Sequence, residues 1–247
     1  MPTLTLLSGR DKSGLKEGYT TLTLKTGELY TIVGDTGSGK SRLIKDVEQL
    51  ADGDTVTGRQ VLLDNMPVPR KDRQAVSAGL MAHLGQSMRF ILDTTVSDFL
   101  VLHACCRGKE PNTEEVLSLA NAITPEPIAP LQNLNLLSGG QTRALMIADI
   151  ALICDSPVVL IDEIENAGID KEKALSLLRR QDKLVLVVTH DPHTALMAPC
   201  RIVMGNGAIK AVVERTAAEK ALFEALSLDY QTQRKHQLLL RRGAHLA

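Results

Sequence analysis

The sequence predicts an α/β fold with a mainly parallel core sheet, an antiparallel β subdomain at the N-terminus and a helical insert. Three observations lead to this prediction. Short apolar segments alternate with amphipathic ones along much of the chain, as in parallel strands joined by crossover helices. Thr and Leu alternate near the N-terminus, which is typical of an antiparallel sheet with one wet face. Residues 95–137 lack strong strands and contain the proline-rich stretch 124–130, so a helical insert is expected at about 95–145.

The N-terminal part is expected to contain three strands and a helix. Residues 3–7 and 19–25 show a period of two, whereas 28–34 is more uniformly apolar, as expected of a strand covered on both faces. The segment from residue 40 to 51 has helical periodicity, and its apolar face carries Leu43, Ile44, Val47 and Leu50. Strand, glycine loop and helix therefore follow one another here.

The second half of the chain repeats the alternation of strand and helix. Further strands are predicted at 79–84, 157–162 and 183–189, with helices between them. Residues 201–213 are expected to form a hairpin, because the Gly-Asn-Gly sequence at 205–207 tolerates positive φ.

The C-terminal tail differs from the rest, and we predict one domain at 1–213 followed by a helical tail at 214–247. Residues 215–228 suggest an amphipathic helix, and 234–243 are apolar with basic flanks. A helix packed on its own domain is favoured over an element that binds anionic lipid or a partner.

The composition is that of a globular protein without affinity for nucleic acid. The chain of 247 residues is 44% hydrophobic and 23% charged, which are ordinary values. It has no Trp, only three Tyr and three Phe, and a formal net charge of −1. Single-stranded nucleic acids stack on aromatic rings, and duplexes are attracted by basic fields, so no nucleic-acid partner is expected.

The cysteines and the apolar segments bear on where the protein works. Cysteines stand at 105, 106, 154 and 200, and the adjacent pair lacks the spacing that chelates a metal, so buried or inert thiols are expected. The N-terminus has no basic region followed by an apolar one, and no apolar run is long enough to span a bilayer. A cytoplasmic protein is expected, which reaches the inner face of a membrane only through a partner.

The first stretch that carries chemistry is "GDTGSGKS", which matches G-x-x-x-x-G-K-[ST] between a predicted strand and a predicted helix. Its glycines let backbone N–H groups approach phosphate oxygens, its lysine adds a positive charge for the β and γ phosphates, and its last serine offers a hydroxyl to Mg²⁺. A simple glycine-rich turn would not need these flanking elements. The expected nucleotide-binding residues are Gly34, Asp35, Thr36, Gly37, Ser38, Gly39, Lys40 and Ser41.

The stretch "PVVLIDE" at 157–163 supplies acidic groups to match this loop. Its apolar run places Asp162 at the C-terminal end of a buried strand, where a carboxylate can bind a metal through water. Glu163 follows as a candidate general base for water. Asp162 could also be a helix cap, but its pairing with the phosphate loop makes that the minor interpretation.

The sequence "LSGGQ" at 137–141 opens a predicted helix and stands between the other two motifs. A phosphate loop, LSGGQ and "LIDE" in this order resemble the ATP-binding-cassette ATPases over roughly residues 3–213, so the fold is expected to be their P-loop NTPase cassette, with the helical insert carrying LSGGQ. In that family two subunits face head to tail, and the LSGGQ of one closes on the γ-phosphate held by the other. The resemblance implies that Ser138, Gly139, Gly140 and Gln141 await a partner's nucleotide, and a serine hydroxyl, bare glycine backbone and a helix N-terminus do form an anion site.

The resemblance extends to three further positions. Gln86 stands where the family has its Q-loop glutamine, which contacts Mg²⁺ and γ-phosphate, so the implied metal ligands are Ser41, Gln86 and Asp162. His190 follows a buried strand as the family's switch histidine does, and Glu163, His190 and Gln86 form the expected catalytic set. Asp170 lies in the D-loop and is expected to order the dimer interface.

Two departures from the family stand out. The stretch "SGRDKSG" at 8–14 has no aromatic ring to stack on adenine, so Arg10 or an aliphatic surface is expected to meet the base. Ile164 replaces the proline that often follows the catalytic glutamate.

The implied function is that of an ATPase subunit that binds ATP and Mg²⁺ in a homodimer or in a heterodimer with a second cassette. Its motion would power a partner, and a membrane-spanning permease is the leading candidate. A soluble ATPase that assembles metalloclusters, as in the Suf system, is the alternative, because that ATPase also lacks the proline. A regulator that binds ATP without hydrolysis is a third possibility, against which Glu163 and His190 speak.

Overall fold

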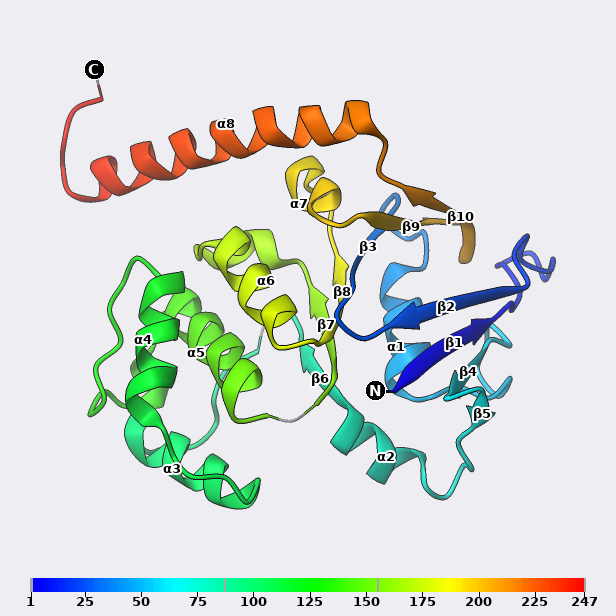
Figure 1. The fold of residues 1–247 in the computed structure, drawn as a ribbon, viewed down its shortest axis with the longest axis horizontal. Helices are drawn as coiled ribbons and strands as arrows, with labels where there is room; N and C mark the ends of the chain where they lie inside the picture. The colour runs from blue at the N-terminus through cyan, green and yellow to red at the C-terminus, as the bar shows by residue number, and fades with distance from the viewer. Residues whose placement is uncertain (1, 87, 155, 247) are drawn as a thin grey trace.

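The computed structural model describes residues 2–86, 88–154 and 156–246, and it contains two sheets with helices around them (Figure 1). The smaller sheet is antiparallel and has the strand order β2-β1-β4-β5. Its strands are β1 (Thr3–Leu7), β2 (Thr21–Lys25), β4 (Gln60–Leu63) and β5 (Met66–Pro67). The antiparallel subdomain expected from alternating Thr and Leu is confirmed, while β4 and β5 were not expected.

The larger sheet has the order β10-β9-β3-β8-β7-β6 and is parallel except where β9 and β10 pair as a hairpin. Its strands are β3 (Leu29–Val33), β6 (Met81–Leu84), β7 (Val158–Asp162), β8 (Leu184–Val188), β9 (Cys200–Gly205) and β10 (Ala208–Glu214). The predicted mainly parallel core sheet and C-terminal hairpin are therefore confirmed.

The helices follow the crossover pattern and fill the predicted insert. In chain order they are α1 (Lys40–Glu48), α2 (Arg73–Leu80), α3 (Val96–Cys106), α4 (Thr113–Ile123), α5 (Gly139–Leu152), α6 (Lys171–Arg180), α7 (Pro192–Met197) and α8 (Ala217–Arg241), with short 3-10 turns at Leu134–Leu136 and Ile164–Ala167. Helices α3 and α4 form the lobe at the lower left of Figure 1, on the opposite side of the large sheet from the antiparallel sheet.

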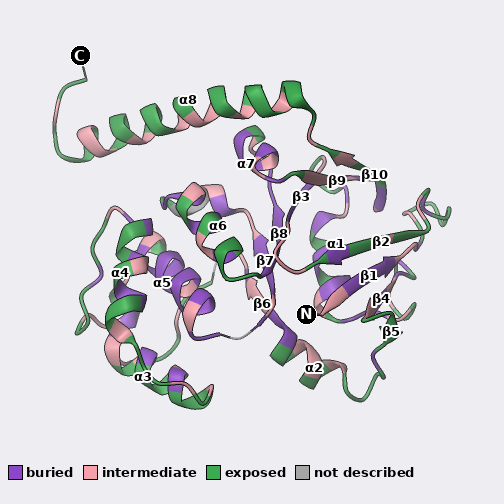
Figure 2. Ribbon diagram, in the orientation of Figure 1, coloured by how far each residue is buried: buried purple, intermediate pink, exposed green. Residues whose placement is uncertain are grey.

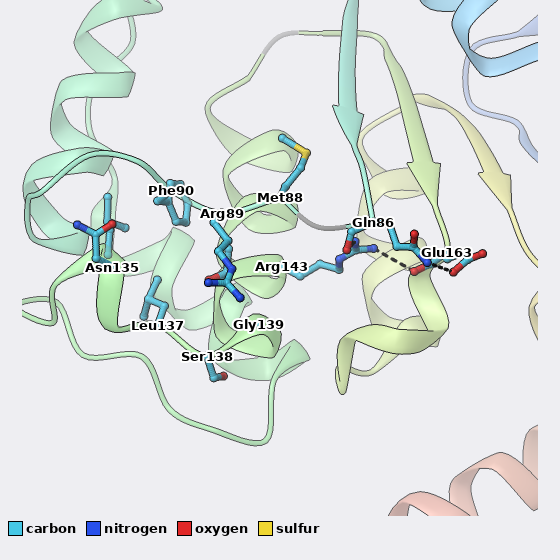
Figure 3. A pocket seen from close by; sticks show the side chains of 12 residues that line it. Gln86, Met88, Arg89, Phe90, Asn135, Leu137, Ser138, Gly139, Arg143 and Glu163 are labelled. Carbon is cyan, nitrogen blue, oxygen red and sulfur yellow. Dashed lines mark hydrogen bonds between the residues drawn. The ribbon is translucent and has the colours of Figure 1, made fainter. Parts of the chain in front are cut away.

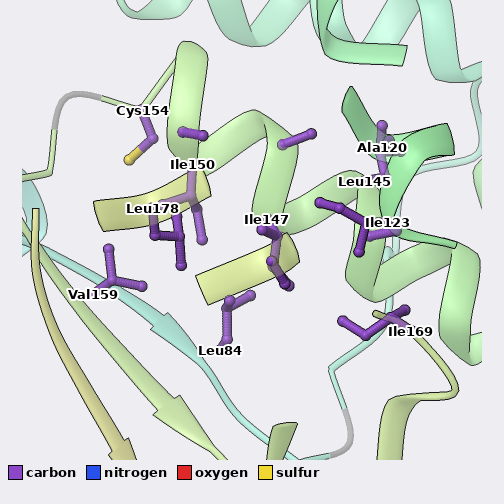
Figure 4. Packing of buried hydrophobic residues seen from close by; sticks show 14 of the residues in the cluster. Leu84, Ala120, Ile123, Leu145, Ile147, Ile150, Cys154, Val159, Ile169 and Leu178 are labelled. Atoms are coloured by element: carbon purple, nitrogen blue, oxygen red, sulfur yellow. The ribbon is translucent and has the colours of Figure 1, made fainter. Parts of the chain in front are cut away.

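The central strands β3, β7 and β8 of the large sheet are covered on both faces, which explains why they are mainly apolar (Figure 2). Along β7 the side chains alternate: Val158 and Leu160 join the core formed with α1 and the antiparallel sheet, whereas Val159 and Ile161 join the core formed with α4, α5 and α6. Figure 4 shows the second core, where Ile147 of α5 lies among residues of the neighbouring elements. The apolar face predicted for α1 is buried as expected.

The register of the sheet brings the ends of three strands to one edge. Asp162 lies opposite Val188 on β8, and Val188 in turn lies opposite Ile32 on β3. The residues that follow β3, β7 and β8 therefore leave the sheet side by side. In open α/β sheets, ligands bind at this carboxyl edge.

Three local predictions are wrong. The strand expected at 79–84 begins at Met81, because α2 continues to Leu80 and pairing with β7 starts with Met81 opposite Val158. The strand expected at 19–25 begins at Thr21, where pairing with Leu7 begins. The helix expected to reach residue 51 ends at Glu48.

The thiols were expected to be buried or inert; two of them are not buried, and that these two are inert stays a prediction. Cys105 and Cys106 are exposed on α3, while Cys154 is buried and Cys200 is intermediate. Neighbouring Ala104 lies in the core, so α3 turns the two thiols away from it.

The C-terminal segments form a single helix, α8, rather than two separate ones. It opens with a capping box of Thr216 and Glu219 and packs on α7, where the His193 ring stacks against Phe223 and Tyr230 with centroids 5.3 and 4.9 Å apart. Packing on its own domain is as predicted. In the part of the chain that the structure describes, neither α8 nor any other helix has the length and apolar character needed to cross a bilayer.

Candidate functional site

The phosphate loop between β3 and α1 has a conformation that only glycine permits at three positions. Gly34, Gly37 and Gly39 have φ of 144°, 79° and 106°. A Cβ on Gly34 would lie 2.3 Å from the carbonyl oxygen of Met204, and one on Gly39 would lie 2.9 Å from Cα of Gly207. The glycines of this motif therefore serve both its curvature and its close packing on the hairpin of β9 and β10.

Lys40 lies inside the curve of this loop. Its Nζ donates hydrogen bonds to the carbonyl oxygens of Gly34, at 2.7 Å, and Asp35, at 2.9 Å. Burial lowers the pKa of the Lys40 ammonium from its ordinary value, against the opposing effect of the Glu163 and Asp162 carboxylates. The charge is thus desolvated and placed close to the acidic residues at the end of β7.

The loop fits a polyphosphate by its donors. Ser38 has a buried hydroxyl oxygen that finds no hydrogen-bond partner among the described residues, and Ser41 is exposed in the first turn of α1. The N-terminus of α1 adds backbone N–H groups and a partial positive charge. Thr36 of the same loop is also exposed. An ammonium, hydroxyls and a helix N-terminus around a glycine cradle are the groups that bind phosphate.

A buried ionic network supports the phosphate loop through the hairpin of β9 and β10. The Ser38 carbonyl accepts from the Gly207 N–H at 2.8 Å, and the Gly207 carbonyl accepts from Arg59 at 2.6 Å. Arg59 is fully buried and pairs with Glu17 at 2.6 Å and Asp46 at 3.0 Å. Removal of one partner from such a buried pair would leave an uncompensated charge and be strongly destabilising. The network ties the antiparallel sheet and the hairpin to the phosphate loop, and the sequence patterns did not predict it.

The three side chains of the expected catalytic set come together at the carboxyl edge of the sheet. Gln86, after β6, donates from Nε2 to the carboxylate of Glu163 (Figure 3). His190, after β8, has Nε2 4.0 Å from Oε1 of Glu163. The backbone N–H of His190 and the Thr189 hydroxyl both donate to Glu165, at 3.1 and 3.0 Å, which orients this segment.

Asp162 ends β7, as predicted, and is partly exposed beside Glu163. No group of three or more His, Cys, Asp or Glu side chains that could hold a metal occurs among the described residues. Mg²⁺ is commonly bound by one or two protein oxygens together with phosphate oxygens and water, so Ser41 and Asp162 suit a metal that arrives with a nucleotide.

The LSGGQ stretch forms the N-terminus of α5 and is capped by its own side chains. Ser138 Oγ accepts from the Gln141 N–H at 3.2 Å, and Gln141 Oε1 accepts from the Ser138 N–H at 2.9 Å. Gln141 also donates to the Pro127 carbonyl at 2.8 Å, so its side chain is used within its own subunit. Gly139 is exposed and has open space where a Cβ would lie, and Gly140 follows it in the first turn.

The Ser138 hydroxyl has a second partner, Glu126, whose carboxylate accepts from it at 2.6 Å. Glu126 also lies 3.5 Å from Arg241 near the end of α8. Ser138 and Gly139 line a cavity of about 590 Å³ together with Gln86 and Glu163 (Figure 3). This cavity runs from the start of α5 to the catalytic set.

The D-loop and the expected base-binding stretch are held by other parts of the chain. Asp170 caps α6 by accepting from the Lys173 N–H at 3.1 Å, and its carboxylate also pairs with Arg234 of α8.

In the stretch expected to meet the base, Arg10 donates to the Gly14 carbonyl at 3.0 Å within its own loop. Lys12 Nζ donates to the Gly37 carbonyl of the phosphate loop at 2.7 Å. A contact between Arg10 and a base stays a prediction.

Besides the Arg59 network, three residues of the site were not predicted from the sequence, namely Arg143, Glu126 and Glu165. Each makes hydrogen bonds that hold one of the motifs in place. A signal existed for Arg143, because it and Asp149 are the two charged residues of a largely apolar helix that follows LSGGQ. Glu126 and Glu165 gave no comparable signal.

Comparisons with known proteins agree with this geometry. The ABC transporter family model matches residues 19–166. An uncharacterised ABC transporter ATP-binding protein of Methanocaldococcus jannaschii is 49% identical over 221 residues, which span 89% of this chain and 85% of that protein. An energy-coupling factor transporter ATP-binding protein of Staphylococcus aureus is 26% identical over 248 residues, covering 87% of this chain and 82% of the relative.

A solved structure shows the same arrangement of elements. It is a dimeric ATP-binding cassette in a post-hydrolysis state with ADP and Pi, 25% identical, with a TM-score of 0.64 over 87% of this chain and 98% of the other. The family match covers the phosphate loop, LSGGQ and the acidic pair at the end of β7 in this chain, and the structural match covers 87% of it. The chain belongs to the ABC transporter family and is an ATP-binding cassette ATPase.

Proposed function

We propose that this cassette hydrolyses Mg-ATP as one half of a head-to-tail dimer and that the resulting motion drives a membrane-spanning permease. The observation that carries the proposal is the meeting of Gln86, Glu163 and His190 at the sheet edge that also holds Lys40. A base, a metal-sensing amide and a histidine beside a phosphate cradle are the groups that γ-phosphate hydrolysis requires.

The roles follow from the positions of the side chains. Lys40 and the loop N–H groups would hold the β and γ phosphates, while Ser41, Asp162 and Gln86 would hold Mg²⁺, which neutralises phosphate charge when bound. Glu163 would accept a proton from water as the water oxygen attacks the γ-phosphorus and ADP leaves. His190 would donate a hydrogen bond to the γ-phosphate oxygens.

The start of α5 would complete the site of a second subunit. Ser138, Gly139 and Gly140 present a hydroxyl and backbone N–H groups at a helix N-terminus, and Ser138 would exchange Glu126 for phosphate when the dimer closes. Gln141 would support this turn through its capping bonds rather than by direct contact. The related cassette that is dimeric with ADP and Pi supports this arrangement. The partner is a second copy of this chain or a similar cassette.

A permease is the proposed partner because the similar S. aureus protein is an energy-coupling factor transporter subunit. The protein would then work at the inner face of the cell membrane. Ile164, which stands where proline is frequent in the family, favours a soluble client as the second candidate. Purification from the native host separates the two: capture of a polytopic membrane protein supports transport, and capture of a soluble metalloenzyme supports assembly.

Because each ATP site would be formed by two subunits, ATP turnover is expected to depend on protein concentration. The rate per molecule is expected to fall on dilution below the dimer dissociation constant. Each ATP site needs the Ser138 turn of a partner, that is, Ser138 and the first turn of α5. Steady-state ATPase assays over a dilution series, with oligomeric state followed by light scattering, measure this. A rate per molecule that stays constant into a strictly monomeric regime contradicts the dimer.

His190→Ala is expected to lower kcat by about 10²- to 10³-fold, since one hydrogen-bond donor to the transition state is lost. The KM for ATP should change much less, because Lys40 and the glycine loop remain. Steady-state kinetics with His236→Ala, an exposed position on α8, as control measure the difference. An unchanged kcat would remove His190 from the mechanism.

A further inference from the structure

Arg143 is a buried guanidinium that joins two segments of the catalytic site (Figure 3). It stands on the first half of α5, and the residue is 8% exposed. One nitrogen donates to the carbonyl oxygens of Gly85 at 2.6 Å and Gln86 at 3.2 Å. The other donates to the carbonyl oxygens of Glu163 at 3.2 Å and Asp162 at 3.4 Å. One side chain thus holds the ends of β6 and β7 together.

These carbonyls belong to the backbone that sets the two reacting side chains. Glu163 has a φ of 53°, in the left-handed region that is unfavourable for a residue other than glycine. Such a conformation persists only when surrounding contacts over-determine it. Two hydrogen bonds fix the backbone of Glu163. Arg143 donates to its carbonyl oxygen, and its own N–H donates to the carbonyl oxygen of Val188 at 3.1 Å.

The chemistry of arginine suits this task. Its planar guanidinium presents donors in two fixed directions, so it can serve the two strand ends at once, which the compact ammonium of lysine does less well. Burial lowers the pKa of the Arg143 guanidinium, while the carboxylates of Asp162, Glu165 and Glu163 raise it. Burial of this cation is costly, and its hydrogen bonds to the carbonyls and the nearby carboxylates offset that cost only while the two strand ends stay in place.

We propose that Arg143 is a positioning residue for catalysis, which fixes the Gln86 and Glu163 backbones of its own subunit in the geometry that activates water. The inference rests on the proposed roles of Glu163 and Gln86. Arg143 lies on the same helix as Ser138, which would serve the partner's nucleotide, yet its four hydrogen bonds all go to its own Gln86 and Glu163 segments. It therefore acts in cis, although the helix that carries it begins with a group that acts in trans.

Arg143→Met keeps an apolar stem of similar length and removes the donors. Its kcat is expected to fall about 10- to 100-fold, as misplacement of a catalytic group by about 1 Å costs. The KM for ATP should change less than about threefold, because the phosphate loop is untouched. Arg143→Lys, which restores the charge and part of the donor set, should recover at least about threefold of kcat over the Met variant.

Arg179→Gln, an exposed arginine on α6, is the matched control and should retain the parent kcat. Circular dichroism and thermal unfolding of each variant report whether it folds. A Met variant that folds and keeps its kcat overturns the inference, and so does a Lys variant that folds yet recovers nothing.

Mixed dimers separate action in cis from action in trans. In a dimer of Arg143→Met with Ser138→Arg, one site combines an intact Arg143 and Glu163 with an intact Ser138, so activity should reappear on mixing. In a dimer of Arg143→Met with Glu163→Gln, both sites carry a defect, so activity should stay low. The reverse pattern would show that Arg143 acts through the Ser138 turn and would overturn the inference.

A calibrating mixture of Ser138→Arg with Glu163→Gln distinguishes failure of this inference from failure of the proposed dimer. It should regain activity if each site is shared between subunits. If it does not, the proposed head-to-tail function is wrong, and the comparison of kcat and KM in the single proteins still decides whether Arg143 positions Glu163.

Discussion

Glu163→Gln is expected to lower kcat for ATP hydrolysis by about 10²- to 10⁴-fold, the range for loss of a general base. The amide is nearly isosteric and can still accept the hydrogen bond from Gln86, but it cannot take a proton from water. Nucleotide binding should persist because Lys40 and its loop are unchanged. Single-turnover assays measure the rate, and size-exclusion chromatography with ATP should show an accumulated nucleotide-bound dimer.

Glu114→Gln, at an exposed position on α4, serves as the control for loss of one carboxylate. It should leave both the rate and the dimer unchanged. If Glu163→Gln turns over ATP at the parent rate, the assignment of the base is wrong.

Lys40→Ala is expected to weaken ATP binding by about 10- to 100-fold, since a hydrogen bond to a charged group is worth about 1.5–3 kcal/mol. Two effects combine: the phosphates lose a buried cation, and the carbonyls of Gly34 and Asp35 lose their donor. The value of kcat should also fall, because charge that develops at the γ-phosphate is less stabilised. Equilibrium binding of a fluorescent ATP analogue, together with steady-state kinetics, separates the two losses.

Lys45→Ala, on the exposed face of α1, is the matched control and should bind ATP as the parent does. A Lys40→Ala protein with parent affinity would place the phosphates elsewhere on the molecule.

Local patterns predicted those parts of the fold that local physics determines. β7 and β8 are apolar because both faces of the sheet are covered, and this is readable as an unbroken run. The hairpin turn at 205–207 is readable because Asn206 and Gly207 adopt positive φ. The errors lie at element ends, such as Leu80, where pairing with a strand far along the chain decides where α2 stops.

Motif spacing predicted which residues would form the candidate site, and their strand-end positions explain why. Gln86, Glu163 and His190 each follow a parallel strand, and the carboxyl ends of parallel strands share one edge. Their mutual contacts confirm that they meet. Their catalytic roles stay predictions that the variants above address.

The sequence by itself determined the glycine cradle, the acidic pair at the end of β7 and the succession of strand, loop and helix from β3 to α1, because each depends on residues close together in the chain. Only the tertiary structure decided that Arg59 supports the phosphate loop, that Arg143 joins the ends of β6 and β7, and that Glu126 occupies the Ser138 hydroxyl. These contacts join residues far apart in sequence, or depend on the direction in which a side chain leaves its helix. Hydrophobic periodicity does not indicate which polar residues will meet across long stretches of chain. The polar contacts that hold the site in place are therefore visible only in the folded structure.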